Sequence, residues 1–311
     1  MKDNIYKFIV ETADKRADVL LVEYFEEVGD AFSRNAIQEL IKKDFVRVDG
    51  KAIKSSRILK QGESVEITIP EQPKIEIKPE DIPIRIIYED EYLIVINKTP
   101  GLVVHPAPGN LQGTLVNAVY YHCGGKLSSI GGETRAGVVH RLDKDTSGLI
   151  VLAKENGTHL DLAKQFSDKT AGRIYYAVVW GLPGQEGSNR VETLFARHPA
   201  DRKKFTSKVA SGKKAITNYK VVSYNDEVSL LRVQLETGRT HQIRVHMHDL
   251  GFPLLGDDVY GKRKARVTAI KRQALHASSL TFIHPVHKLK LSFISPLEDD
   301  IKALLKKEGL I

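Results

Sequence analysis

Residues 140–148 read His-Arg-Leu-Asp-Lys-Asp-Thr-Ser-Gly, a polar stretch that lies between two apolar runs. The run before it is Ala-Gly-Val-Val (136–139), and the run after it is Leu-Ile-Val-Leu-Ala (149–153). The second run contains β-branched residues and has the length of a buried strand, but it is short for a helix. We therefore expect residues 140–148 to form a loop at the edge of a sheet, where polar side chains often carry chemistry.

Two known loop patterns match this stretch in part. Asp143, Asp145, Ser147 and Gly148 fit positions one, three, five and six of an EF-hand calcium loop, but Lys154 stands where a glutamate is needed. An Asp-x-Asp-x-Thr nucleophile of phosphoryl-transfer enzymes needs an apolar strand that runs straight into its first aspartate. Here a histidine and an arginine interrupt that strand. The sequence therefore disfavours both patterns.

Asp143 is the candidate for a reacting carboxylate. The neighbouring Arg141 and Lys144 favour its ionised form and attract phosphate groups, whereas burial opposes ionisation. Asp145 and Thr146 have short polar side chains of the kind that often bond to nearby backbone amides. We expect these two residues to shape the loop while Asp143 acts.

The stretch resembles the signature loop of the RluA/RluD-type pseudouridine synthases, which reads His-Arg-Leu-Asp-x-Asp-Thr-Ser/Thr-Gly. Five further blocks of the family occur in the expected order between roughly residues 85 and 296. They are Gly-Leu-Val-Val-His-Pro (101–106), Arg-Ile-Tyr-Tyr-Ala-Val (173–178), Glu-Thr-Gly-Arg-Thr-His-Gln-Ile-Arg-Val-His-Met (236–247), Gly-Asp-Asp-Val-Tyr-Gly (256–261) and Gln-Ala-Leu-His-Ala (273–277).

This resemblance implies an enzyme that isomerises uridine to pseudouridine in structured RNA without a metal or another cofactor. It favours large-subunit ribosomal RNA as the substrate. A synthase that acts on transfer RNA and a non-catalytic RNA-binding ribosome-assembly factor remain alternatives. Short apolar runs and a few helical stretches do not alternate regularly, which favours an α+β fold. The resemblance adds a mixed, mostly antiparallel sheet with a central cleft.

The family's catalytic positions fall on Asp143, Tyr175 and Arg244. Asp143 either attacks the anomeric carbon of the ribose or removes a ribose proton, and both routes stay open. Tyr175 is expected to stack on the target uracil, with its hydroxyl as the candidate for moving the proton from carbon 5. Strand alternation sends its side chain to the face opposite Tyr176. Arg244 is expected to pair with Asp143, and Arg141 to help hold the nucleotide out of its stack.

Residues 240–250 are predicted to form a helix that ends before a glycine. His241, Arg244 and His248 share one face of this helix by their three-plus-four spacing. A zinc site made of His241, His246 and His248 is disfavoured, because almost two turns separate the first and last histidine and no carboxylate is fixed nearby.

Residues 1–70 are predicted to form a small RNA-binding domain. A helix that begins near residue 16, a second one over 33–43 and an Asp-Gly hairpin step at 49–50 resemble the alpha-L, or S4-like, module of a ribosomal small-subunit protein. Residues 31–60 hold eight cations and three anions, so the charge gathers on one face. In such modules the second helix and the following turn face RNA. The residues that this implies are Arg34, Lys42, Lys43 and Arg47.

Residues 70–83 contain four prolines and no amphipathic period, which predicts an extended linker over 71–83 before a catalytic domain over 84–311. The single cysteine excludes an internal disulfide and a cysteine-only metal site. No apolar run approaches ~18–20 residues, and the N-terminus lacks the apolar core of a secretion signal. We expect a cytoplasmic protein with no membrane contact and no obligatory protein partner. Its net charge of +8 agrees with a polyanionic partner.

Overall fold

The computed structural model describes residues 4–11, 14–28, 32, 34–69, 77–107, 109–130, 132–184, 187–201, 203–261 and 270–311, without the side chains of Asn35 and Glu133. The chain divides into two compact units, Met1–Lys74 and Ile75–Ile311. Within the described residues, no helix is long and apolar enough to cross a membrane.

The smaller unit combines helices with short antiparallel strands. Its elements are β1 (Asn4–Ile9), β2 (Lys15–Arg16), α1 (Ala17–Glu27), α2 (Arg34–Lys42), β3 (Val46–Val48), β4 (Lys51–Ala52), β5 (Ile58–Leu59) and β6 (Ser64–Ile69). The larger sheet has the order β1-β6-β3-β4, and β2 pairs with β5. Asp49 and Gly50 connect β3 to β4 with φ angles of 49° and 73°. Two positive φ angles are typical of a type I′ hairpin turn, so the predicted hairpin is confirmed.

Helix α2 has one apolar and one basic side. Ile37 and Ile41 are buried against α1 and the sheet, where Phe25 and Val46 belong to the same cluster. Each such side chain contributes about 1.5–3 kcal/mol of hydrophobic stabilisation when it is fully buried. The opposite side of the helix is free to carry charge.

The larger unit is built on a long sheet. Its elements are β7 (Ile86–Glu89), β8 (Leu93–Lys98), α3 (Leu115–His122), the 3-10 helix η1 (Glu133–Arg135), β9 (Ser147–Ala153), α4 (Asn156–Ser167), β10 (Gly172–Trp180), β11 (Ser188–Arg197), β12 (Phe205–Thr206), β13 (Lys213–Tyr224), β14 (Val228–Leu235), α5 (Gln242–Asp249), β15 (Leu275–Ile283), β16 (Lys290–Ile294) and α6 (Asp299–Lys307).

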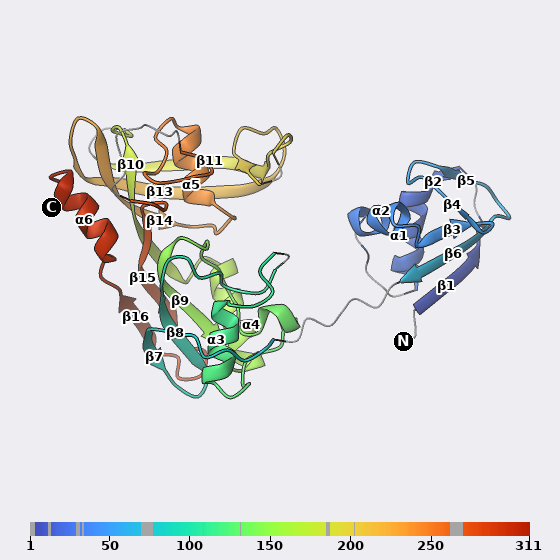
Figure 1. Cartoon of the computed structure of the whole chain (residues 1–311), viewed down its shortest axis with the longest axis horizontal. Helices are drawn as coiled ribbons and strands as arrows, with labels where there is room; N and C mark the ends of the chain where they lie inside the picture. Colours follow the sequence, from blue (N-terminus) through green and yellow to red (C-terminus); the bar gives the residue numbers. More distant parts are fainter. Residues whose placement is uncertain are drawn as a thin grey trace. The chain divides into compact units, whose positions relative to one another are not determined.

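The strand order of this sheet is β12-β11-β13-β14-β10-β15-β9-β8-β7, with β16 paired to β15 (Figure 1). Strands β9 and β15 pair in parallel, while the other recorded strand pairs of the described residues are antiparallel. The predicted α+β fold with a mixed, mostly antiparallel sheet is therefore confirmed.

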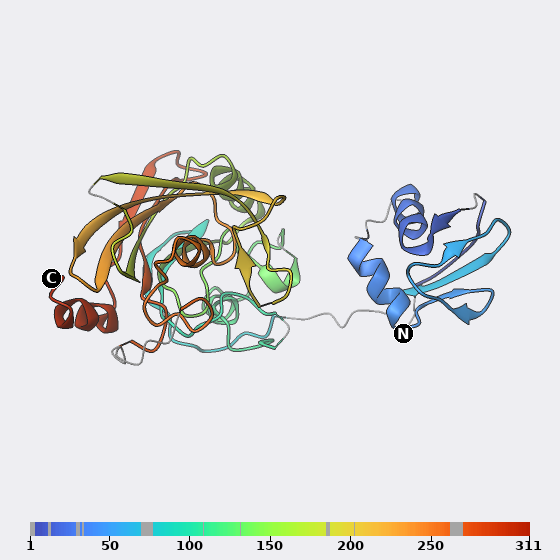
Figure 2. The ribbon, with the colours of Figure 1, turned by 90° about the horizontal axis from the view of Figure 1, so that it is seen from above.

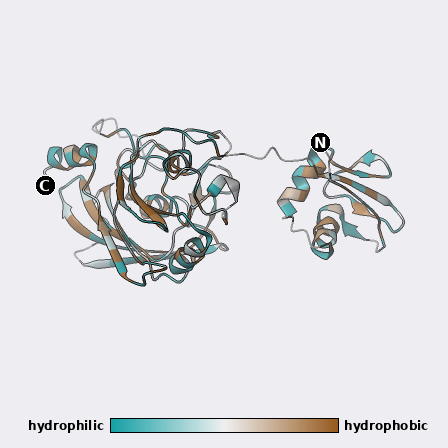
Figure 3. Cartoon of the chain, turned by 90° about the horizontal axis from the view of Figure 1, so that it is seen from below, coloured by the Kyte–Doolittle hydropathy of each residue, from teal (hydrophilic) through white to brown (hydrophobic). Residues whose placement is uncertain are grey.

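Strands β8 and β9 lie at the centre of the apolar core, and every residue of both strands is buried. Side chains on one face join a cluster with α3, and those on the other face join a cluster with α4. Burial on both faces explains why these runs are continuously apolar instead of alternating. Figure 3 shows the apolar residues along the strands inside this unit.

Two helices, α5 and α6, pack against strands of this sheet. Helix α5 contacts β12 and β13, and Figure 2 shows it beneath the long strands. It begins two residues later than predicted, because His241 has a left-handed φ of 60° and ends the preceding turn. Helix α6 buries Ile301, Leu304 and Leu305 in a cluster with residues of β10 and β14.

Residues 77–83, which were predicted as the second half of the linker, lie on the larger unit. Asn117 Nδ2 in α3 donates to the carbonyl oxygen of Lys78 at 2.8 Å, and the Gly113 amide donates to Glu80 Oε1 at 2.9 Å. Residues 70–76 lie outside the described residues. The described part of this proline-rich segment is therefore held by hydrogen bonds.

Candidate active site

Lys98 lies at the end of β8 and holds the loop before β9. Its side chain is 1% exposed, and its Nζ donates to the carbonyl oxygens of Thr99, Leu102 and Lys144 at 2.9, 3.0 and 2.8 Å. Burial lowers the pKa of Lys98 to about 7, although the two aspartates of the loop favour its charged form. A buried cation therefore fixes the backbone one residue beyond Asp143.

Arg272 holds the same loop from the other side. Its Nη1 donates to the carbonyl oxygen of Asp145 at 3.0 Å, while Nε and Nη2 form a bidentate pair with Asp300 of α6 at 2.6 and 2.8 Å. The amide of Thr146 donates to the carbonyl oxygen of Asp143 at 3.1 Å and closes a turn. Asp145 thus shapes the loop through its backbone carbonyl. The predicted bond from its side chain to a nearby amide is not found among the described residues.

Gly148 allows β9 to approach β15 closely at the point where these strands pair in parallel. It has a φ of 111°, and a Cβ atom there would lie 2.2 Å from the carbonyl oxygen of Ala277. A larger residue would push the strands apart. The glycine that ends the polar stretch therefore sets the position of the loop relative to β15.

Asp143 is hydrogen-bonded to a buried ion pair, which Arg244 of α5 forms with Asp257. Arg244 Nη1 donates to Asp143 Oδ2 at 3.0 Å, while its Nε and Nη2 donate to the carboxylate of Asp257 at 2.7 and 2.9 Å. Burial alone would raise the pKa of Asp257, but the bonds from Arg244 hold it below its usual value. Burial also opposes the charge of Arg244, yet both carboxylates raise its pKa. The guanidinium is therefore fixed and charged.

Aromatic residues enclose this pair. The Arg244 guanidinium lies 5.2 Å from the ring centre of Tyr260, whose hydroxyl bonds to His241 Nδ1 at 3.0 Å. His241 Nε2 lies 3.9 Å from Asp143 Oδ1. Burial lowers the pKa of His241 below that of a free histidine, so this ring is uncharged at neutral pH. The second oxygen of Asp143 therefore faces an uncharged histidine.

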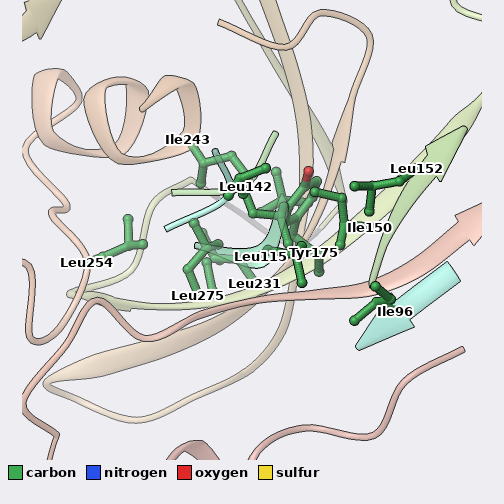
Figure 4. Packing of buried hydrophobic residues seen from close by; sticks show 14 of the residues in the cluster. Ile96, Leu115, Leu142, Ile150, Leu152, Tyr175, Leu231, Ile243, Leu254 and Leu275 are labelled. Atoms are coloured by element: carbon green, nitrogen blue, oxygen red, sulfur yellow. The ribbon is translucent and has the colours of Figure 1, made fainter. Parts of the chain in front are cut away.

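Tyr175 lies in β10 with its ring in the apolar core. It is 5% exposed and packs with Leu142, Leu231 and Ile243, as Figure 4 shows. Burial raises the pKa of Tyr175, so its hydroxyl keeps its proton at neutral pH. Tyr176 packs in a different cluster on the other face of the sheet, which confirms the predicted alternation.

These groups line a pocket of about 500 Å³. Asp143, Tyr175 and Arg244 all contribute to its wall. Its remaining arginines are Arg135, Arg141, Arg173 and Arg239. A pocket with five guanidinium groups around one carboxylate is suited to a polyanionic substrate.

One further group in the described residues brings metal-ligand types together. Atoms of Asp90, His284 and His287 lie within 4.8 Å of one another. However, His284 Nδ1 accepts hydrogen bonds from the amides of Val286 and His287, which leaves its proton on Nε2. That nitrogen donates to Asp90 Oδ2 at 2.9 Å. A metal ion would have to displace this proton, so hydrogen bonding accounts for the group.

Comparison with known proteins identifies the family of this chain. Residues 92–249 match the family model described as RNA pseudouridylate synthase. The chain is also 46% identical over 250 residues to the ribosomal large subunit pseudouridine synthase D of Zymomonas mobilis, with 78% of each chain covered. The chain belongs to the RNA pseudouridylate synthase family.

Other similar proteins agree with this family. The RNA pseudouridine synthase YlyB of Bacillus subtilis is 39% identical over 303 residues, which cover 96% of this chain and 98% of that protein. The solved structure of human RNA pseudouridylate synthase domain containing 4 has a TM-score of 0.57 at 24% identity, covering 73% of this chain and 94% of that chain. The human structure supports the fold of the synthase.

These similarities confirm the predicted enzyme class and an RNA substrate. Asp143, Tyr175, Arg244 and Arg141 come together in one pocket, as the sequence predicted. Two residues that hold Asp143 in place, Lys98 and Asp257, were not predicted. Asp257 stands in a recognised block of the family, but nothing in the sequence shows that it reaches Arg244.

The other predicted RNA-binding residues lie in the smaller unit of the synthase. Lys42, Lys43 and Arg47 are exposed at the end of α2 and in β3. Arg34 is different, because its Nε donates to the buried carboxylate of Asp18 at 3.0 Å. That carboxylate also binds Arg16 and Gln38. Arg34 therefore stabilises the contact between α1 and α2 as well as presenting part of its guanidinium.

Proposed function

We propose that this synthase isomerises uridines in large-subunit ribosomal RNA. The support is its similarity to proteins named ribosomal large subunit pseudouridine synthase D, at 46% identity in Zymomonas mobilis and 39% in Pseudomonas aeruginosa. We also place its action in the cytoplasm, the compartment in which bacterial ribosomes assemble.

We assign the reacting carboxylate to Asp143. The observation that carries this assignment is its hydrogen bond to Arg244, which Asp257 holds from behind in the floor of an arginine-lined pocket. The reaction breaks the bond between ribose C1′ and uracil N1, turns the uracil and joins C1′ to C5. The proton lost from C5 is balanced by the proton that N1 gains. Attack on C1′ and removal of a ribose proton both need Asp143 ionised.

Arg244 and Tyr175 are assigned supporting roles at the reacting atoms. Arg244 orients the carboxylate and keeps its charge balanced before the substrate enters. Tyr175 packs its ring against the target uracil, which aromatic side chains favour energetically. Its hydroxyl has no hydrogen bond to another described residue and is therefore available to the substrate. Because burial raises its pKa, this hydroxyl keeps its own proton at neutral pH, so moving the C5 proton needs a hydrogen-bonded substrate group or water to take up the phenol proton.

The smaller unit is assigned to RNA binding. We propose that residues 1–70 form an S4-like module, joined through 71–83 to the catalytic domain over 84–311. Lys42, Lys43 and Arg47 are exposed and lie close together in sequence on α2 and β3. Exposed cations on one face can neutralise phosphates at little desolvation cost.

The deciding experiment maps pseudouridines in total RNA by chemical labelling. Cells that lack the gene are compared with the same cells complemented by the wild type or by Asp143→Asn. We expect discrete large-subunit ribosomal sites to disappear and to return only with the wild type. Lost sites in transfer RNA would keep the chemistry and overturn the target. Intact sites everywhere would favour an RNA-binding assembly factor.

A further inference from the structure

Arg173 is a buried cation in the pocket wall that forms no ion pair with any residue the structure describes. Its residue is 8% exposed, and Nε is buried without a hydrogen-bond partner. Among the described residues, its recorded contact is the Phe166 ring, whose centre lies 5.2 Å from the guanidinium carbon. Arg244, by contrast, is paired with two carboxylates. An arginine does not lose its proton in proteins, so its burial without an anion is costly.

The adjacent loop is shaped to leave room for this guanidinium. A Cβ atom on Gly238 would lie 2.7 Å from Arg173 Nη1. Gly238 has no left-handed φ angle, and a larger residue there would require the end of the Arg173 side chain to move. The loop therefore leaves space for the buried Arg173 guanidinium, which forms no ion pair with the described residues.

Other polar atoms near Arg173 also lack partners. The buried side-chain atoms without a hydrogen bond among the described residues number six, and three of them belong to pocket residues: His105, His140 and Arg173. Burial, and next the charge of Arg173, lower the pKa of His140 to about 3. Burial, with Arg141 and Arg135, lowers the pKa of His105 to about 4. Both rings are neutral near pH 7, so the positive charge of this wall comes from arginines.

We propose that Arg173 binds a phosphate group of the target nucleotide. Arg173 and Tyr175 are two residues apart in β10, so their side chains leave the same face of the strand about 7 Å apart. This separation is comparable with the span from a base to its own phosphate. A guanidinium suits such a ligand because it donates two parallel hydrogen bonds to phosphate oxygens. The inference rests on the proposed contact between Tyr175 and the target uracil.

The freed uracil is a second anion that forms during the reaction, and it is the alternative ligand of Arg173. When the bond from C1′ to N1 breaks, the freed uracil carries the electron pair of that bond. A guanidinium that stabilised this charge would act on the rate of bond cleavage. A guanidinium that binds phosphate acts on the affinity for RNA before any bond breaks. Binding and single-turnover measurements therefore separate the two.

The test uses Arg173→Met, which keeps an apolar stem against Phe166 and removes the charge. We expect the affinity for a transcript with a mapped target uridine to fall roughly 10- to 100-fold. The slope of log affinity against log salt should decrease by about 1, because one phosphate contact is lost. The single-turnover rate at saturating enzyme should stay within about threefold of the wild type.

Two further variants separate position from charge. Gly238→Ala keeps every charge but places a methyl group against the guanidinium, and we expect it to weaken RNA binding as well. Arg173→Lys should restore the salt slope but only part of the affinity, since an ammonium lacks the two parallel bonds. The control is Lys302→Met on α6, which removes the same charge outside the pocket and should leave the slope unchanged.

Stability distinguishes this role from a structural one. Removal of an unpaired buried charge should leave the thermal midpoint of the free protein unchanged or raised. A lowered midpoint with an unchanged salt slope would overturn the proposal, and so would a large loss of single-turnover rate with unchanged affinity. If the wild type forms no product on the transcript, the proposed target fails; if it forms product but Arg173→Met, Arg173→Lys and Gly238→Ala all bind normally, only the Arg173 assignment fails.

Discussion

The loop around Asp143 and the basic side of α2 use charge in opposite ways. Around the Asp143 loop, Lys98, Arg244 and Arg272 are buried and bonded to fixed carbonyl or carboxylate oxygens. At the end of α2, Lys42 and the following Lys43 are exposed and form no ion pair with other described residues. A buried, bonded charge positions a reacting group, whereas an exposed one attracts a flexible polyanion. We therefore expect variants of the charges bonded around Asp143 to change rates, and variants of the exposed cations at the end of α2 to change affinity.

Asp143→Asn should show the largest effect. The amide keeps the shape of the side chain but removes its reactive charge, so RNA should still bind while product formation falls by at least about 10³-fold. Binding is measured by filter retention, and product by single-turnover release of the C5 proton. Near-normal turnover in this variant would remove Asp143 from the reaction and would show that the buried charges around it do not position a reacting group.

Asp257→Asn should reduce the rate by roughly 10²-fold, because a small displacement of a positioned group has an effect of this size. The variant breaks the bidentate bond that fixes Arg244 and should lower kcat far more than it raises KM. Asp258→Asn is the matched control, since Asp258 is exposed beside it in sequence. Equal losses in both variants would mean that the carboxylate of Asp257 is not what orients Arg244.

Lys98→Met should change how stability depends on pH. The folded protein releases the Lys98 proton near pH 7, whereas the unfolded chain keeps it up to about pH 10.5. The unfolded state therefore binds more protons between these values, and stability rises with pH there by up to about 1.4 kcal/mol per unit. Denaturant unfolding at several pH values should show this rise in the wild type relative to Lys98→Met. Parallel curves would show that Lys98 does not titrate in this window.

Lys42→Glu combined with Lys43→Glu should have the smallest effect on chemistry. RNA affinity should fall roughly tenfold and the salt slope by about 2, while the rate on bound RNA stays the same. Lys306→Glu with Lys307→Glu changes the same charge on a pair of exposed neighbours at the end of α6. If both pairs weaken binding equally, net charge and not the α2 face is responsible.

Local patterns predicted much of the fold because they depend on neighbours in sequence. The Asp49-Gly50 hairpin and the opposite faces of Tyr175 and Tyr176 follow from turn chemistry and periodicity. The start of α5 was misplaced by two residues, because the left-handed conformation of His241 depends on its contacts with Tyr260 and its approach to Asp143. A periodic pattern carries no record of such contacts.

By itself, the sequence indicated the family of the synthase, the loop to which we assign the reacting carboxylate, and the charges of that loop. The tertiary structure decided what keeps those charges in place. Arg244 lies 101 positions from Asp143, and Arg272 lies 127 positions from the carbonyl that it holds. Only the pairing of β9 with β15 and the packing of α5 and α6 bring them together. The reason is physical: the cost of burying a charge, as at Lys98 or Arg173, depends on its surroundings in three dimensions and not on its neighbours along the chain.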